Sequence, residues 1–337
     1  MPSAATLINM APRPTLAKVA LAAGVSKTTA SYVLNGQKKM SAETTRRVTE
    51  AARQLGYRLD SAASGLSRGR SQVIGVLAVE SVPELVVGAN SLFWLRFNDA
   101  FIRHCSEEGL VVSFAGERKA QELIDSGIDA LVVLGNHATE VFEELRVPFG
   151  LPIISLDPIP GHDNVQLSYD NDAIAAAVAG HLMDQGCTHL NWLSIDGAQK
   201  VLGPLQDSLE HWTAANGLAF STAMHDSTAE GVQRAVDKAL DDGADGFFSA
   251  LGIPRLITDA LANRGRTIPD DVLLVIQAEG LVEQSMTPSI STMSYRSFDC
   301  GTAVADMCVG VVRDGSHPAT VPLEFELVIR ESSLRNP

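Results

Sequence analysis

Hydrophobic residues in the first sixty positions recur at three- and four-residue intervals, which is the spacing of one helix face. The pattern predicts three short helices whose inward residues are Leu16, Val19, Ala20 and Ala23, then Ala30, Val33 and Leu34, then Val48, Ala51, Ala52 and Leu55. Thr15, Ser26 and Ser41 stand where N-caps are expected, and Gly24 and Gly56 where the first and third helices end. Two short helices joined by a glycine-containing turn are typical of a helix-turn-helix.

From residue 73 onward, short apolar runs alternate with helical stretches. One series is VIGVLAV, LVVSFAG, DALVVLG and LPIISLD, and a second is HLNWLSI, GLAFSTAM, ADGFFSAL and DVLLVIQ. Such alternation predicts parallel sheets covered by helices on both faces. Two series of four predict two lobes, with the crossing between them inside residues 165–190.

Composition agrees with an α/β body. The chain has 337 residues, 45% of them hydrophobic and only 5% aromatic, so we expect more than one domain with a core of aliphatic side chains. No apolar run approaches the roughly 18 residues that span a membrane. Residues 1–14 lack the features of a secretory signal, so we expect a cytoplasmic, nucleoid-associated protein and no membrane partner.

Charge is distributed unevenly along the chain. The net charge is −14, but residues 1–71 hold eleven Lys and Arg against three acids, a formal charge of +8. The remainder therefore carries −22. A basic head on an acidic body indicates a polyanionic partner for the head.

The second predicted helix presents polar side chains suited to that partner. Its first six positions include Lys27, Thr28, Thr29, Ser31 and Tyr32. Lysine can bond to guanine O6 and N7, hydroxyls can bond to bases or phosphates, and helix N-termini favour phosphate. A single residue of this type on a helix surface is more often merely solvated than bound to DNA. Five of them within six positions of the second helix favour DNA binding.

The segment Gly65-Leu66-Ser67-Arg68-Gly69 matches the G-x-S-x-G pattern of hydrolases. That pattern requires a strand before the serine and a helix after it, whereas here an apolar strand follows. We therefore interpret the match as accidental. No H-E-x-x-H, Walker A or G-x-G-x-x-G pattern is present elsewhere, so we expect neither an enzyme nor a bound cofactor. The four widely spaced cysteines are expected to be reduced and to serve packing.

Residues 15–60 closely resemble the DNA-binding head of the lac and galactose repressor family (LacI/GalR), through A-G-V-S at 23–26, V-L-N at 33–35 and L-G-Y at 55–57. The resemblance implies that Lys27, Thr28 and Tyr32 read base edges. It also implies residues that hold phosphates or orient the helix, namely Thr15, Ser26, Thr29, Ser31, Asn35, Ser41, Thr44 and Tyr57. Lys18 departs from the family, which usually has an acid there. The same alignment suggests a translation start at Met10.

By the same resemblance, the polar segment 60–72 is a hinge that folds when two copies meet over the operator centre. Ala63 and Leu66 then occupy the minor groove, where Leu66 wedges into a base step and kinks the duplex. Ser64 and Gly65 depart from the family, and the glycine weakens a hinge helix by up to ~1 kcal/mol relative to alanine.

The body resembles the family's effector module, which has the fold of periplasmic sugar-binding proteins and binds ligands between its lobes. Here the expected pocket differs from the family. Ser208 replaces an arginine, Leu251-Gly252 replaces Asn-Asp, and Glu279 is the one acid kept in Gln277-Ala278-Glu279-Gly280. These losses remove charge-assisted hydrogen bonds to sugars or nucleobases.

Three further residues are candidates for that pocket. Asp157 ends a strand, where capping is as good an explanation as ligand contact. Phe93 and Trp94, expected in a long loop over 80–94, could line the pocket, pack within a lobe or contact a second copy.

Together these features predict a small all-α helix-turn-helix head on an α/β, two-lobed, periplasmic-binding-protein-like body. The expected domains are a flexible extension at 1–14, the DNA-binding domain at 15–59, the hinge at 60–72 and the effector and dimerisation domain at 73–337. We expect a repressor that binds a pseudo-palindromic operator as a homodimer, with a small-molecule effector, a protein effector or none. Without a heptad tail, no tetramer is expected. The alternative is a soluble solute-binding sensor without a transcriptional role.

Overall fold

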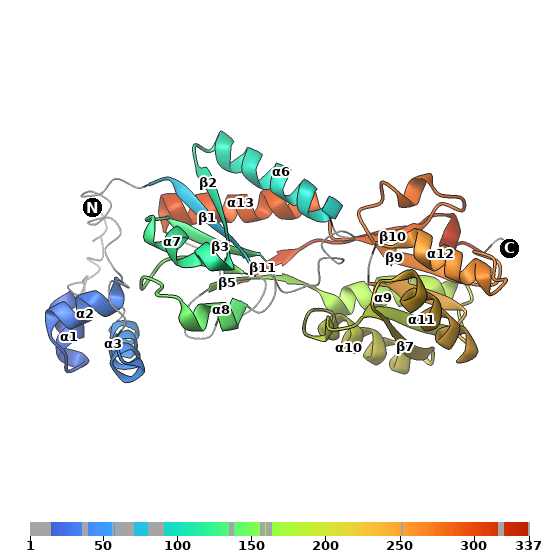
Figure 1. The fold of residues 1–337 in the computed structure, drawn as a ribbon, viewed down its shortest axis with the longest axis horizontal. Helices are drawn as coiled ribbons and strands as arrows, with labels where there is room; N and C mark the ends of the chain where they lie inside the picture. The colour runs from blue at the N-terminus through green and yellow to red at the C-terminus, as the bar shows by residue number, and fades with distance from the viewer. Residues whose placement is uncertain are drawn as a thin grey trace, which may run out of the picture.

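The computed structural model describes residues 15–35, 40–55, 57, 71–79, 91–134, 138–155, 159, 164–250, 252–315 and 320–335. Figure 1 shows a small helical head followed by two α/β lobes along the long axis of the molecule. The head consists of α1 (Leu16–Ala22), α2 (Lys27–Leu34) and α3 (Ala42–Gln54). The predicted fold class, a helical head on a two-lobed α/β body, is confirmed.

The head's local structure follows its sequence closely. Thr15, Ser26 and Ser41 cap the three helices with their hydroxyl oxygens, and Gly24 has a φ of +63°, as the turn requires. The predicted inward residues form the head's core, with one exception. Leu55 is 37% exposed because α3 ends at Gln54, which places Leu55 at the cap and away from the buried face.

The lobe nearer the head, called the N-lobe, has a six-stranded parallel sheet in the order β11-β5-β4-β3-β1-β2, in which β11 (Thr320–Leu323) comes from late in the chain. Its first elements are, in chain order, β1 (Val73–Ala78), α6 (Ser91–Glu107), β2 (Val111–Gly116), a 3-10 turn (Glu117–Lys119), α7 (Ala120–Asp125), β3 (Ala130–Leu134), α8 (Ala138–Glu144), β4 (Ile153–Ser155) and β5 (Asn164–Tyr169). Separate buried clusters lie on the two faces of this sheet, as expected for a sheet covered on both sides.

The other lobe, called the C-lobe, has the strand order β12-β10-β9-β8-β6-β7. Its elements are α9 (Asn171–Asp184), β6 (His189–Ile195), α10 (Gln199–Asn216), β7 (Ala219–His225), α11 (Ala229–Asp241), β8 (Gly246–Ser249), α12 (Pro254–Asn263), β9 (Leu273–Gln277), a 3-10 turn (Glu283–Ser285), β10 (Ser291–Ser294), β12 (Glu326–Val328) and a 3-10 turn (Glu331–Ser333). All described pairings are parallel except that of β10 with β12.

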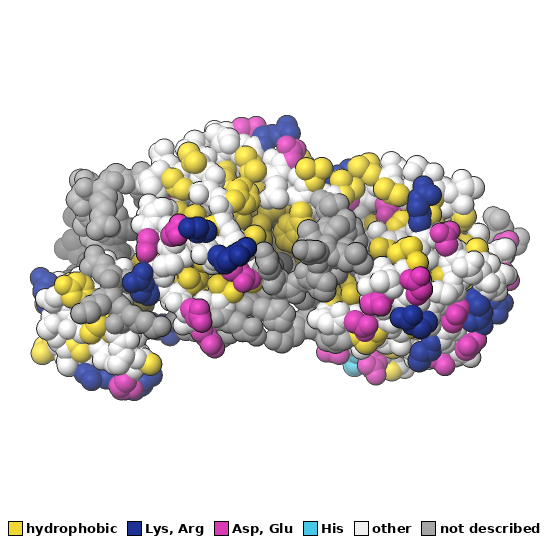
Figure 2. Space-filling view, in the orientation of Figure 1, with side chains coloured by type: hydrophobic (Ala, Val, Ile, Leu, Met, Phe, Trp, Pro, Cys, Tyr) yellow, Lys and Arg dark blue, Asp and Glu magenta, His cyan; other side chains and the backbone are white. Residues whose placement is uncertain are grey.

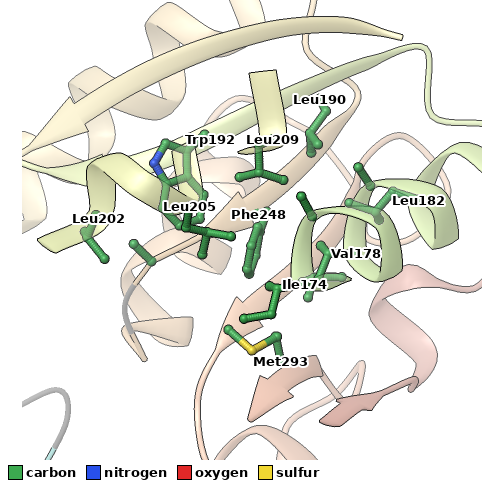
Figure 3. Packing of buried hydrophobic residues seen from close by; sticks show 14 of the residues in the cluster. Ile174, Val178, Leu182, Leu190, Trp192, Leu202, Leu205, Leu209, Phe248 and Met293 are labelled. Carbon is green, nitrogen blue, oxygen red and sulfur yellow. The ribbon is translucent and has the colours of Figure 1, made fainter. Parts of the chain in front are cut away.

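The core of the C-lobe shows how the helices cover its sheet. Figure 3 shows Ile174, Val178 and Leu182 of α9 facing Trp192 and Phe248 of the sheet, with the leucines of α10 beside them. Trp192 and Phe248 are fully buried, with ring centroids 4.9 Å apart. Each such side chain contributes about 1.5–3 kcal/mol when removed from water.

The chain crosses between the lobes three times. The predicted crossing is confirmed, since β5 ends at Tyr169 in the N-lobe and α9 begins at Asn171 in the C-lobe. Two further crossings were not predicted. After β10 the chain returns to the N-lobe through α13 (Ser297–Asp314) and β11 (Thr320–Leu323), and it then re-enters the C-lobe at β12. The two predicted series of four strands lie one in each lobe, and each sheet has two further strands that were not predicted, namely β5 and β11 in the N-lobe and β10 and β12 in the C-lobe.

Helices α6 and α13 lie against each other on the N-lobe, and at Gly301 their backbones are in close contact. A Cβ added at Gly301 would lie 2.3 Å from the carbonyl oxygen of Phe97. Phe93 and Trp94 belong to α6, so the expectation that they lie in a loop is wrong. Both rings pack against the N-lobe core, which agrees with lobe packing as one of the predicted alternatives.

The cysteines lie inside the described part of the body. All four are buried and unpaired with one another. Burial raises the pKa of Cys105 to about 11, which keeps that thiol protonated and unreactive near neutral pH. Across the described residues, no helix has the length and apolar character needed to cross a membrane.

Candidate nucleic-acid interface and interlobe site

The second helix of the head presents its polar side chains outward from its N-terminal end. Lys27 and Thr28 are exposed, and the ring of Tyr32, one turn further along, is 38% exposed. Ala30 and Leu34 on the opposite face are buried in the head's core. The amphipathic pattern therefore leaves the three predicted base-reading side chains on the solvent side of α2.

Several residues predicted to hold phosphates or orient this helix form local caps. The Ser26 hydroxyl accepts a hydrogen bond from the Thr29 amide at 3.0 Å, and the two hydroxyls lie 2.8 Å apart. Ser41 and Thr44 repeat this arrangement at α3, at 3.2 and 2.8 Å. Thr15 caps α1 more weakly, at 3.4 Å. These residues hold the helix starts in place whether or not they also contact phosphate.

The C-terminal end of α2 is held by its own side chains. The Asn35 amide nitrogen donates to the Ser31 carbonyl oxygen at 2.9 Å and lies 3.1 Å from the Ser31 hydroxyl. Tyr57 packs, half-buried, against the head's core. The hinge candidates Ala63 and Leu66 lie outside the described residues.

One residue that the sequence analysis missed connects α3 to the helix-turn-helix turn. Arg47 donates from Nε to the Ala23 carbonyl oxygen at 3.1 Å and from Nη2 to the Gly24 carbonyl oxygen at 3.1 Å. These carbonyls belong to the end of α1, where intrahelical donors run out. Arg47 therefore holds α3 against the turn between α1 and α2. No local pattern marks it, because its partners lie more than twenty residues away.

The residues predicted to line the effector pocket do not form one group as the DNA-binding candidates on α2 do. Ser208 on α10 donates its hydroxyl proton to Asp172 of α9 at 2.6 Å, so it joins two helices of one lobe. Asp157 and Leu251 lie outside the described residues. Phe93 and Trp94 pack within the N-lobe, as described above.

Glu279, which follows β9, is the predicted pocket residue with the most contacts. Its carboxylate accepts hydrogen bonds from the Ser297 hydroxyl at 2.6 Å and the Ser294 hydroxyl at 3.3 Å, and its side chain is 7% exposed. Arg96 of α6 places Nη1 4.0 Å from Glu279 Oε2. Ser297 begins α13 and Arg96 belongs to the N-lobe, so this carboxylate connects the two lobes.

The neighbouring crossings are also joined to each other. The Tyr169 hydroxyl donates to the Tyr295 carbonyl oxygen at 3.1 Å, and the two ring centroids are 4.3 Å apart. Close by, the buried side-chain carbonyl oxygen of Gln277, at the end of β9, has no hydrogen-bond partner. A buried acceptor of this kind is costly unless a donor reaches it, so Gln277 marks a polar position at the carboxyl edge of the sheet.

Comparisons with known proteins agree with this arrangement. Residues 15–60 match the family model for bacterial regulatory proteins of the lacI family, and residues 179–333 match the periplasmic binding protein-like domain. The HTH-type transcriptional regulator CelR of Thermobifida fusca is 25% identical over 344 residues, covering 95% of this chain and 98% of CelR.

Solved structures share the fold. The lac repressor dimer bound to operator and the anti-inducer ONPF matches with a TM-score of 0.65 at 18% identity, covering 96% of this chain and all of the repressor chain (100%). A LacI family transcriptional regulator from Arthrobacter sp. FB24, in complex with lactose, matches with a TM-score of 0.63 at 20% identity, covering 77% of this chain and 99% of that chain.

Proposed function

Since this chain belongs to the lacI family of bacterial regulatory proteins and is a DNA-binding transcriptional regulator, we propose that it represses transcription by binding a pseudo-palindromic operator as a homodimer. The observation that carries the proposal is the outward face of α2, where Lys27, Thr28 and Tyr32 are exposed beside a capped helix N-terminus. In this proposal these three side chains read base edges, and the capping residues and backbone amides hold phosphates. The chain is not an enzyme.

Exposed hydrophobic side chains on the N-lobe support the proposed homodimer. Figure 2 shows hydrophobic side chains gathered over the part of the N-lobe where α6 and β2 lie. The exposed members on α6, β2 and α13 are Leu95, Ile102, Val111, Phe114 and Phe298. A surface of this kind is typical of a protein–protein contact. A two-fold dimer would place two heads on two half-sites of one palindrome.

The effector site is proposed to lie between the lobes, at the edge marked by Glu279 and Gln277. CelR has been solved in complex with cellobiose and the Arthrobacter regulator in complex with lactose, but the residues here argue for a different ligand. Ser208 is bonded to Asp172, and Glu279 is bonded to Ser294 and Ser297. An ordinary free sugar or nucleobase would have to displace these bonds, and Ser208 stands where the family usually has an arginine to hold such a ligand.

A calorimetric screen tests this inference on the effector. We expect common monosaccharides and nucleobases to give no heat of binding at millimolar concentrations. Less polar ligands carrying an N–H or O–H donor for Gln277 are the class in which binding is expected. Tight binding of a common monosaccharide would refute the altered pocket.

The lobes offer a route from effector to DNA. In the proposed mechanism, a ligand that changes the angle between the lobes changes the spacing of the two hinges at residues 60–72. Operator affinity then depends on the relative stability of two lobe arrangements. A ligand shifts the equilibrium toward the arrangement that it binds more tightly, by an amount set by the difference between its two affinities.

The test of the proposed function is a binding-site selection on random duplex DNA, with full-length protein, no added ligand and fixed physiological salt. Salt is fixed because phosphate contacts make affinity steeply dependent on ionic strength. Enrichment of a palindrome with a central pyrimidine–purine step supports the proposal, because such steps kink most easily. If the folded, dimeric protein enriches no sequence with or without cell extract, the proposal fails.

The hinge makes a separate prediction. Leu66→Ala should weaken operator binding on the order of tenfold, since an inserted leucine side chain loses about 1.5–3 kcal/mol of burial, partly offset by less unstacking. Binding to unrelated duplexes should hardly change. Titration of both duplexes at one salt concentration measures the difference, and an equal loss on both would contradict the minor-groove role of Leu66.

A further inference from the structure

In the described part of the chain, a residue of the body, Phe149, contacts the head. Phe149 lies in the loop between α8 and β4, and its backbone N–H donates to the Leu34 carbonyl oxygen at 2.6 Å. Its ring packs, half-buried, against the core of the head. Among the described residues of the body, Phe149 is the only hydrophobic one that joins this cluster. The head shown beside the N-lobe in Figure 1 is therefore in specific contact with it.

The polar half of this contact has a clear physical reason. Leu34 is the last residue of α2, and the last carbonyls of a helix have no intrahelical donor. The Asn35 side chain already serves the Ser31 carbonyl one turn earlier. The Phe149 amide supplies a donor for Leu34, so the body completes the C-terminal cap of the helix that is proposed to read DNA.

The apolar half matters because the head has a small core. Its buried residues are Val19, Ala20, Ala23, Ala30, Leu34, Val48, Ala51 and Ala52, of which five are alanines. A core of this kind buries little apolar area, so a single aromatic ring packed against it adds considerably to the apolar area that the head buries. A phenylalanine from outside the head is thus well suited to hold it.

We propose that Phe149 is a docking residue that seats the head on the N-lobe with its DNA-reading end facing outward. The contact is at the C-terminal end of α2, whereas Lys27 and Thr28 lie at the other end, about 10 Å away along an eight-residue helix. Both side chains remain exposed in the docked head. Docking and base reading therefore use opposite ends of one helix and are compatible.

Docking orders the head before DNA arrives. A head free to rotate would lose that freedom on binding, whereas a docked head has already lost it, which is preorganisation. The Phe149 loop continues directly into β4 of the N-lobe sheet, so the orientation of the head follows that of the lobe. This functional consequence rests on the proposed operator binding, but the docking itself does not.

The test compares full-length Phe149→Ala with Phe149→Leu and Arg146→Ala. Arg146 lies three residues earlier in the same loop and contacts Asp125 and Gln121 of the N-lobe. A fluorophore is attached through Ala42→Cys, an exposed position at the start of α3, and the four buried native thiols remain unlabelled. Time-resolved anisotropy without DNA then reports whether the head rotates with the body.

We expect Phe149→Ala to add a fast rotational component to the anisotropy decay and to weaken operator binding about threefold to tenfold. Both substitutions at position 149 keep the backbone amide, but Phe149→Leu also keeps a large apolar side chain, so Phe149→Leu and Arg146→Ala should behave like the parent protein. An unchanged decay in Phe149→Ala overturns the docking. Unchanged or tighter operator binding, with the fast component present, overturns the preorganising role. If the parent protein binds no duplex, the proposed function fails, while the decay still decides the docking.

Discussion

Replacing Gly301 by valine should lower the free energy of unfolding by about 3 kcal/mol or more, at the upper end of the range for overpacked cores. A Cβ at this position would lie 2.3 Å from the Phe97 carbonyl oxygen and 3.1 Å from the Ala100 Cβ. The first of these neighbours is backbone, which cannot rotate away as a flexible side chain could. Helices α6 and α13 would have to separate, and the buried cluster that they share would lose contacts.

Thermal or denaturant unfolding of the Gly301→Val protein measures this loss. Gly180→Ala is the control, because Gly180 also lies within a helix, α9, but an added Cβ there meets only the Trp212 ring, at an ordinary contact distance of 3.5 Å. The control should be neutral or stabilise by up to ~1 kcal/mol, from helix propensity alone. Wild-type stability of Gly301→Val would mean that α6 and α13 do not pack in this register.

Lys27→Ala should relax sequence discrimination by roughly 1–3 kcal/mol at a single base pair of each half-site, with smaller effects elsewhere. Lys27 is the first residue of α2, and its side chain is exposed on the face opposite the head's core. From that position an ammonium group can bond to O6 and N7 of guanine in the major groove. The loss should therefore be confined to the base pair that Lys27 reads.

The experiment uses a set of operator duplexes in which every half-site position carries each of the four base pairs in turn. The affinity of the parent protein and of Lys27→Ala for each duplex is measured by titration at fixed salt. Lys18→Ala is the control, since Lys18 is exposed on α1 and carries the same charge outside the reading helix. It should weaken all duplexes about equally or have no effect. If Lys27→Ala also weakens all duplexes equally, Lys27 contacts phosphate and does not read a base.

The head could be predicted almost completely from the sequence. Its caps at Thr15, Ser26 and Ser41 and its left-handed turn at Gly24 involve atoms only a few residues apart. Local side-chain bonds and backbone sterics determine such features, so the order of residues is enough to predict them. Arg47 was missed because its carbonyl partners at Ala23 and Gly24 are close only after the three helices pack.

The interlobe site was predicted less well. Glu279 was predicted as the acid kept near the pocket, but the positions of Ser294, Ser297 and Arg96 around it were not predicted. Ser297 and Arg96 come from helices of the N-lobe, and one of these helices arrives by a crossing that no local pattern marks. Phe93 and Trp94 were expected in a loop because the sequence pattern before them does not indicate where α6 begins.

The sequence by itself therefore determined the three helices of the head, most of the strands, the charge of the basic head and the residues that face outward from its second helix. These depend on periodicity, capping and charge, which act over one or two turns of chain. Only the tertiary structure decided that α13 and β11 return to the N-lobe, that Glu279 is bonded across the lobes, and that Phe149 completes the end of α2. Each of these is a contact between segments far apart in sequence, and such contacts form only when the whole chain packs.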